Sequence, residues 1–250
     1  MLKNTFVHIP GIGDLIERRL WDEGIISWDD FLDNEDSVPL QGRTKQFVRS
    51  YVKESKKHLD NKNHHYFVDR IPRRELWRAY KEFKDSVAFL DIETTGLSSE
   101  RHVITMIGVY DGKASKVFTR GRNLSKFPSE ISKFKSIVTF NGARFDIPFI
   151  QSAFPGLRLH QIHIDIMYPL RRLGYRGGLK GIEKQVGIAR SEETDGLSGY
   201  DAVILWRRHL KGDENALDIL ERYNIEDIEN LKTLSDLAYK ELKREYFPDE

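Results

Sequence analysis

The stretch Phe89-Leu90-Asp91-Ile92-Glu93-Thr94-Thr95-Gly96-Leu97 decides the fold, because it places two acidic residues at the end of an apolar run. The run from Val87 to Ile92 is typical of a buried strand. Side chains alternate between the faces of a strand, so Asp91 and Glu93 share one face. A divalent cation such as Mg²⁺ or Mn²⁺, which prefers oxygen ligands, would relieve their repulsion. A solvated strand end is the simpler explanation of the pair taken alone.

Further strands and helices follow this stretch in an order that predicts an α/β domain. Short apolar runs predict strands at 103–110, 116–119, 137–140 and 162–164. Apolar residues at helical spacing predict helices at 145–154, 179–186, 200–210 and 214 to about 242. Three consecutive strands, followed by alternating strands and helices, indicate a mixed sheet with helices on both faces, beginning near Ser86.

A third acidic residue, Asp146, ends the segment Asn141-Gly142-Ala143-Arg144-Phe145-Asp146, which links the strand at 137–140 to the next helix. A carboxylate at the N-terminus of a helix is stabilised by the helix dipole. This effect alone is a sufficient explanation for Asp146.

The long helix predicted at the C-terminal end carries a fourth acidic residue, Asp227. Tyr223 and Asp227 are four residues apart and therefore share one helix face. The same face carries the apolar residues Leu220, Leu231 and Leu234. Because an unpaired buried charge is costly, Asp227 needs a partner. A salt bridge would satisfy it, and so would a metal ion shared with Asp91 and Glu93.

In order and approximate spacing, these residues resemble the three motifs of the DEDD (DnaQ-like) 3′–5′ exonucleases: Asp91-x-Glu93, Asn141…Phe145-Asp146 and Tyr223-x-x-x-Asp227. The tyrosine resembles the subgroup that has Tyr in place of His. The flanking residues are similar to YprB-type ribonuclease-H-like proteins. They are Trp77, His163-x-Asp165, Pro169-Leu170-Arg171-Arg172-Leu173 and Gly177-Gly178-Leu179-Lys180. The similarity covers about Tyr66 to Leu242.

This resemblance implies a ribonuclease-H-like fold and a 3′–5′ exonuclease that uses two divalent ions, Mg²⁺ or Mn²⁺. It implies that Asp91, Glu93 and Asp227 hold the ion that activates water. Asp91 and Asp146 would hold the ion at the leaving oxygen. Tyr223 would orient the water rather than act as a base, since its ordinary pKa is about 10. The residues matched to substrate contacts are Thr94, Thr95, Leu97 and Asn141, with a core position as the alternative for Leu97.

His163 lies in the predicted strand at 162–164, and Asp165 follows directly after that strand. Since its neighbours are apolar, we expect His163 to be a hydrogen-bonded core residue rather than a metal ligand. Asp165 follows the strand and is expected at most to support the site.

Near the N-terminus, Val7-His8-Ile9-Pro10-Gly11-Ile12-Gly13-Asp14-Leu15 resembles a helix-hairpin-helix motif. Gly11 and Gly13 would let backbone amides approach a phosphate without reading base sequence. Asp14 would compete for the same amides, and an ordinary helical turn is the alternative.

A basic helix is predicted from Arg43 to about Leu59. Its cations recur near helical spacing, which favours contact with a polyanion, although a solvated helix face is the alternative. They are Lys45, Arg49, Lys53, Lys56 and Lys57. The sequence therefore predicts a helical nucleic-acid-binding module over 1–60, a connector over 61–85 and a ribonuclease-H-like exonuclease domain over 86–250.

Composition bounds the remaining possibilities. The chain has 250 residues and no cysteine, which excludes disulfides, thiolate catalysis and cysteine metal sites. No long uncharged apolar run indicates a membrane span or a secretory signal, so we expect a cytoplasmic protein. We expect a nucleic-acid substrate, DNA rather than RNA and single-stranded. A non-catalytic nucleic-acid-binding scaffold and an endonuclease with the same metal site are the alternatives.

Overall fold

The computed structural model describes residues 1–34 and 38–247. The chain divides into two compact units. The first comprises Met1–Asp85 with His160–Ile162, and the second comprises Ser86–Leu159 with His163–Glu250. No helix in the described part of the chain has the length and apolar character needed to cross a membrane.

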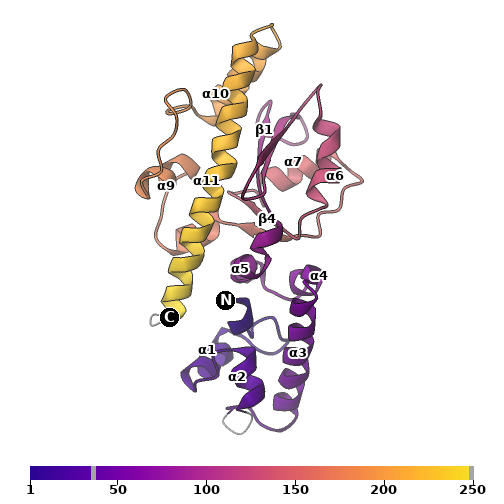
Figure 1. Ribbon diagram of the computed structural model, residues 1–250, viewed down its shortest axis with the longest axis vertical. Helices are drawn as coiled ribbons and strands as arrows, with labels where there is room; N and C mark the ends of the chain where they lie inside the picture. The colour runs from indigo at the N-terminus through magenta and orange to yellow at the C-terminus, as the bar shows by residue number, and fades with distance from the viewer. Residues whose placement is uncertain (35–37, 248–250) are drawn as a thin grey trace. The chain divides into compact units, whose positions relative to one another are not determined.

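The first unit is helical, as the sequence predicted for its N-terminal part. Ser27 caps the start of the second helix of this unit. Its hydroxyl accepts from the Asp30 amide at 3.1 Å, and the Asp30 carboxylate accepts from the Ser27 amide at 2.8 Å. Residues 61–85, expected to be a connector, form helices here and bury Phe67 and Trp77. The elements are η1 (Leu2–Asn4), α1 (Asp14–Asp22), α2 (Trp28–Asp33), α3 (Gly42–Asp60), α4 (His64–Val68), η3 (Arg73–Ala79), α5 (Tyr80–Phe83) and η4 (Lys84–Ser86) (Figure 1).

The second unit is built on a five-stranded mixed sheet of order β3-β2-β1-β4-β5. Its strands are β1 (Val87–Thr94), β2 (Ile104–Tyr110), β3 (Ser115–Thr119), β4 (Ser136–Thr139) and β5 (Ile162–Asp165). The central strand β1 is antiparallel to β2 and parallel to β4. β2 and β3 both lie on one side of β1, because the chain turns back twice, through residues 95–103 and 111–114, before it crosses over to β4.

Helices cover both faces of this sheet, as predicted. On one face, α6 and α7 contribute Phe127 and Phe149 to a core that includes Leu90 and Ile92 of β1. On the other face, α10 and α11 pack against β1 and β2 (Figure 1). The helices of this unit are η5 (Leu124–Lys126), α6 (Phe127–Ile131), α7 (Asp146–Ala153), α8 (Met167–Arg172), α9 (Leu179–Gln185), α10 (Gly199–His209) and α11 (Glu214–Tyr246). The short helices α6 and α8 were not predicted.

Candidate metal centre

Three carboxylates meet between the sheet and α11. Asp91 and Glu93 come from β1, and Asp227 comes from the buried face of α11. One oxygen atom from each side chain lies within 4.8 Å of the corresponding atoms of the other two. Alternation along β1 and the helical period of α11 therefore bring together acids that are 134 or more residues apart.

Burial and mutual repulsion make the ionised cluster costly without a cation. Burial, and then the charge of Asp227, raise the pKa values of Asp91 and Glu93 well above their ordinary range. Burial raises the pKa of Asp227 to about 6, although the positive charge of Arg190 opposes the increase. Bound cations invert this situation because they stabilise the ionised form of each carboxylate.

Asp146 lies at the first position of α7 and is buried, but it lies outside the group of three. Burial raises its pKa to about 8, and its charge in turn contributes to the raised pKa of Asp91. The helix dipole alone does not account for this residue, because Asp146 is buried and its Oδ1 accepts no hydrogen bond. Asp146 is thus electrostatically coupled to the cluster.

The unpaired oxygens of the site fit a divalent cation. Among the described residues, Glu93 Oε1 and Asp146 Oδ1 are buried and accept no hydrogen bond. Buried polar atoms of this kind are rare unless an ion or water occupies the site. Carboxylate oxygens are the ligands that Mg²⁺ and Mn²⁺ prefer. These residues therefore suit a divalent metal ion.

The stabilisation that Mn²⁺ gives is expected to grow from pH 6 to pH 8. In the metal-free protein, the raised pKa values of Asp227 and Asp146, about 6 and 8, keep protons that an unfolded chain has lost. The folded metal-free state therefore loses stability as the pH rises through this window. Metal binding needs deprotonated ligands, so the affinity for Mn²⁺ increases as the pH rises. Thermal unfolding with Mn²⁺ and with chelator at both pH values measures the difference, and a larger metal-induced shift at pH 6 would contradict it.

Asn224 is a site residue that sequence reasoning missed. It is fully buried beside Tyr223 on α11, and its Nδ2 donates to Asp91 Oδ2 at 3.0 Å. Gly108 lies opposite Asp91 on β2, and a Cβ atom there would come within 2.1 Å of Asn224 Oδ1. The absence of a side chain at Gly108 therefore makes room for the amide that orients Asp91.

Gly108→Ala is expected to lower the free energy of unfolding by about 1–3 kcal/mol, the usual cost of overpacking a core. The same change would displace Asn224 from Asp91. Gly156→Ala is the matched control, since nothing lies within 4 Å of the added methyl group. Denaturant unfolding compares the two variants, and equal stability would show that Asn224 moves aside without cost.

Arg190 is a second residue that the sequence did not indicate. Its Nε and Nη2 donate to Glu183 at 2.7 and 2.6 Å, and Nη2 also donates to Asp227. A guanidinium group suits this bidentate arrangement. The salt bridge considered as an alternative for Asp227 thus exists. It does not replace a metal ion, because it leaves Glu93 Oε1 unpaired.

Tyr223 lies one turn before Asp227. Lys180, for which the sequence predicted no role in the site, fixes the orientation of the Tyr223 hydroxyl. Lys180 Nζ donates to Tyr223 Oη at 2.6 Å and lies 3.8 Å from the ring centroid. An ammonium group has no acceptor, so Tyr223 Oη accepts from it and keeps its own proton for another partner. Burial raises the pKa of Tyr223, which favours a hydrogen-bond donor over a base.

The predicted substrate-contact residues after β1 differ in accessibility. Thr94 is buried and its hydroxyl donates to Gly96 O at 2.7 Å. The Thr95 amide donates to Val103 O at 3.0 Å, so it is already paired. Leu97 is 87% exposed, which excludes the alternative of a core position. Of the three, Leu97 is the one free to contact a ligand with its side chain.

Asp165 supports the loop that leads to Asp146. Its carboxylate accepts from the amides of Asn141 at 2.7 Å and Ala143 at 3.1 Å. These bonds hold Asn141 in the left-handed region, with φ of 62°. His163 Nε2 lies 2.8 Å from the Thr139 hydroxyl, so this half-buried ring has a hydrogen-bond partner.

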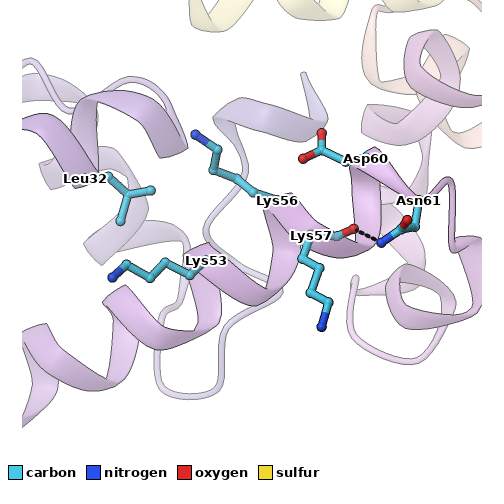
Figure 2. A pocket seen from close by; sticks show the side chains of 6 residues that line it. All are labelled: Leu32, Lys53, Lys56, Lys57, Asp60 and Asn61. Carbon is cyan, nitrogen blue, oxygen red and sulfur yellow. Dashed lines mark hydrogen bonds between the residues drawn. The ribbon is translucent and has the colours of Figure 1, made fainter.

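The predicted phosphate contacts of the first unit lie in its glycine turn and on α3. Gly11 has a φ of 84° and Gly13 caps α1, but only the short η1 precedes this turn, so a complete helix-hairpin-helix stays a prediction. Lys56 pairs with Asp29, so one of the five cations predicted along this basic helix is already neutralised. A pocket of about 380 Å³ opens beside the cations of α3 (Figure 2). Its lining residues are Leu32, Lys53, Lys56, Lys57, Asp60 and Asn61.

Comparison with known proteins agrees with the fold of the second unit. A family model described as RNase_H superfamily matches residues 88–239. No curated protein matches the sequence. One similar solved structure is the family B DNA polymerase from the hyperthermophilic archaeon Pyrobaculum calidifontis, with a TM-score of 0.47 and 19% identity. The match covers 62% of this chain and 24% of the polymerase chain, so the chain spans about a quarter of that protein's length.

Proposed function

We propose, since the chain belongs to the RNase_H superfamily, that it is a metal-dependent nuclease that shortens a nucleic-acid strand from its 3′ end. The observation that carries the proposal is the cluster of Asp91, Glu93 and Asp227, in which Glu93 and Asp227 are buried and Asp91 is half-buried. Within this cluster, Glu93 Oε1 accepts no hydrogen bond. A purely structural network of ion pairs would have given this buried oxygen a partner.

In this proposal Asp91, Glu93 and Asp227 hold one divalent ion, and Asp91 with Asp146 a second. Such ions, when bound, polarise a phosphodiester group and lower the pKa of water. Asn224 orients Asp91 by donating to its carboxylate at 3.0 Å.

Tyr223 positions the nucleophilic water by donating its phenolic proton. Lys180 favours that direction of donation, because it already donates to Tyr223 Oη and leaves the phenolic proton for another partner. Arg190, anchored by its bidentate contact with Glu183, holds the Asp227 carboxylate in place. The exposed Leu97 side chain contacts the terminal nucleotide, and Thr94, Thr95 and Asn141 shape the loops on either side of the site.

The products and the polarity of cleavage test this proposal. A 5′-labelled linear single strand of DNA, incubated with Mn²⁺ or Mg²⁺, should give a ladder of shortened labelled strands and free nucleoside monophosphates. A covalently closed single-stranded circle should stay intact, because it has no 3′ end. Cutting of the circle would identify an endonuclease, and an undigested linear strand would favour a non-catalytic scaffold.

We further propose that the first unit holds the strand through phosphate contacts at Gly11, Gly13, Lys45, Arg49 and Lys53. Lys53 is exposed on α3, and Figure 2 shows its side chain extending beside the pocket. A one-signed cationic face of this kind binds a polyanion without base specificity.

Replacing Lys45 and Lys53 together with glutamine should flatten the salt dependence of binding. On a single strand each lost phosphate contact removes about 0.7 from the slope of log K against log salt, so the pair should remove about 1.4. The rate at saturating strand should stay unchanged. Lys56→Gln is the matched control because Lys56 already pairs with Asp29. Anisotropy titrations measure the slopes, and an unchanged slope in the double variant would leave α3 as a solvated face.

A further inference from the structure

The exposed face of α10 carries a line of residues that suits a ligand. Tyr200 is 68% exposed and Ile204 is 37% exposed, and Arg207 and Lys211 are also exposed. Tyr200, Ile204 and Arg207 are four and three residues apart, which places them along one side of the helix. Lys211 follows in the turn after α10, which ends at His209. The opposite side packs against α11 through residues such as Trp206. We call this exposed line the α10 stripe.

The α10 stripe begins next to the candidate metal centre. Leu197 O, just before α10, accepts a hydrogen bond from Lys180 Nζ, which also donates to Tyr223 Oη. Hydrogen bonds from Ser198 lower the pKa of Asp201, in the first turn of α10, and the charge of Lys180 lowers it further. An 11-residue helix is about 16 Å long, roughly three to five nucleotides of a strand.

The cations of the α10 stripe are available to a polyanion. Within the residues that the structure describes, neither Arg207 nor Lys211 forms an ion pair, whereas the adjacent Arg208 binds Asp213 at 2.7 Å. In the acidic loop that precedes the helix, Glu193 pairs with Arg222 and Asp195 pairs with Lys184. Two of the three acids of that loop are therefore compensated, and the last turn of α10 is cationic.

We propose that the α10 stripe binds the single strand that leads into the metal centre. Tyr200 stacks on a base, Ile204 supports an adjacent sugar or base, and Arg207 and Lys211 contact phosphates. Stacking on an aromatic ring is possible for every base, but only where the base is not already paired in a duplex. The site thus selects single-stranded nucleic acid without base preference. This inference rests on the proposed nuclease function and names its substrate class.

Binding of a labelled thymidine oligonucleotide in chelator tests the inference without any hydrolysis. Tyr200→Ala should weaken binding about 5- to 150-fold, whereas Tyr200→Phe should bind like the wild type because it keeps the ring. Arg207→Gln should reduce the salt slope by about 0.7, and Arg208→Gln, one residue away and already paired, should not. A ribonucleotide strand of the same sequence should bind within a few-fold, since the contacts do not read the 2′-hydroxyl.

A small substrate separates this inference from the proposed function. The p-nitrophenyl ester of thymidine 5′-monophosphate reaches only the metal centre, so Tyr200→Ala should cleave it at the wild-type rate. Loss of that cleavage in Tyr200→Ala, or wild-type oligonucleotide binding by this variant, would overturn the α10 proposal. No cleavage by the wild-type protein would instead overturn the nuclease function, and the binding data would still decide the role of α10.

Discussion

Asp227→Asn is expected to reduce single-turnover hydrolysis of a DNA strand by at least about 1,000-fold. The change replaces an anionic oxygen of the cluster by an amide nitrogen, which cannot hold a divalent ion. The carbonyl oxygen that remains can accept from the Arg190 guanidinium, which can only donate, so the nitrogen is left facing the cluster. Rapid-quench digestion in Mn²⁺ measures the effect, and Asp91→Asn should behave in the same way.

The matched control for this variant is Asp218→Asn, because Asp218 is an exposed acid on the same helix. It should hydrolyse the strand at the wild-type rate. Unfolding in chelator should show that Asp227→Asn remains folded, since Arg190 keeps its bidentate contact with Glu183. Wild-type activity of a folded Asp227→Asn protein would remove Asp227 from the catalytic cluster.

Tyr223→Phe is expected to slow the chemical step by about 10- to 1,000-fold while the strand binds with unchanged affinity. The substitution keeps the ring and removes only the hydroxyl that donates to the nucleophilic water. If Lys180 acts by fixing that hydroxyl, Lys180→Met should be costly in the wild type but nearly neutral in Tyr223→Phe. A double-mutant cycle on single-turnover rates measures this coupling. Additive losses would show that Lys180 acts independently of Tyr223.

Much of the fold and the acidic cluster could be predicted because they depend on two short periods. Alternation along β1 places Asp91 and Glu93 on one face, and the helical period of α11 places Asp227 on the face that meets it. The predicted basic helix at 43–59 corresponds to α3. Val48 and Val52, four residues apart, lie on the buried face of this helix. Local patterns therefore suffice where a side chain's direction follows from its own element.

The contacts of Arg190 and Lys180 could not be predicted because no period fixes them. Arg190 follows a short helix in an irregular segment, and its partner Asp227 is 37 residues away. The burial of Asn224 could have been predicted from the sequence, since this residue directly follows Tyr223 on the buried side of α11. Its role depends on the space at Gly108, and that space appears only when β2 pairs with β1.

The basic face of the first unit shows the same limit. The sequence placed five cations along one helix, but it gave no sign that Lys56 would bind Asp29, because the pair forms only when α3 packs beside α2. Residues 61–85 lacked a long apolar period, and their aromatic residues are buried one at a time by short helical turns. Partners of single side chains, unlike faces of long helices, depend on tertiary packing.

The most direct test of the metal centre is a calorimetric titration of the metal-free protein with Mn²⁺, followed by single-turnover digestion over the same concentrations. The account predicts that Mn²⁺ binds, that hydrolysis appears over the same range, and that Asp91→Asn loses both. Hydrolysis that persists in excess chelator, or Mn²⁺ binding that Asp91→Asn leaves unchanged, would contradict it.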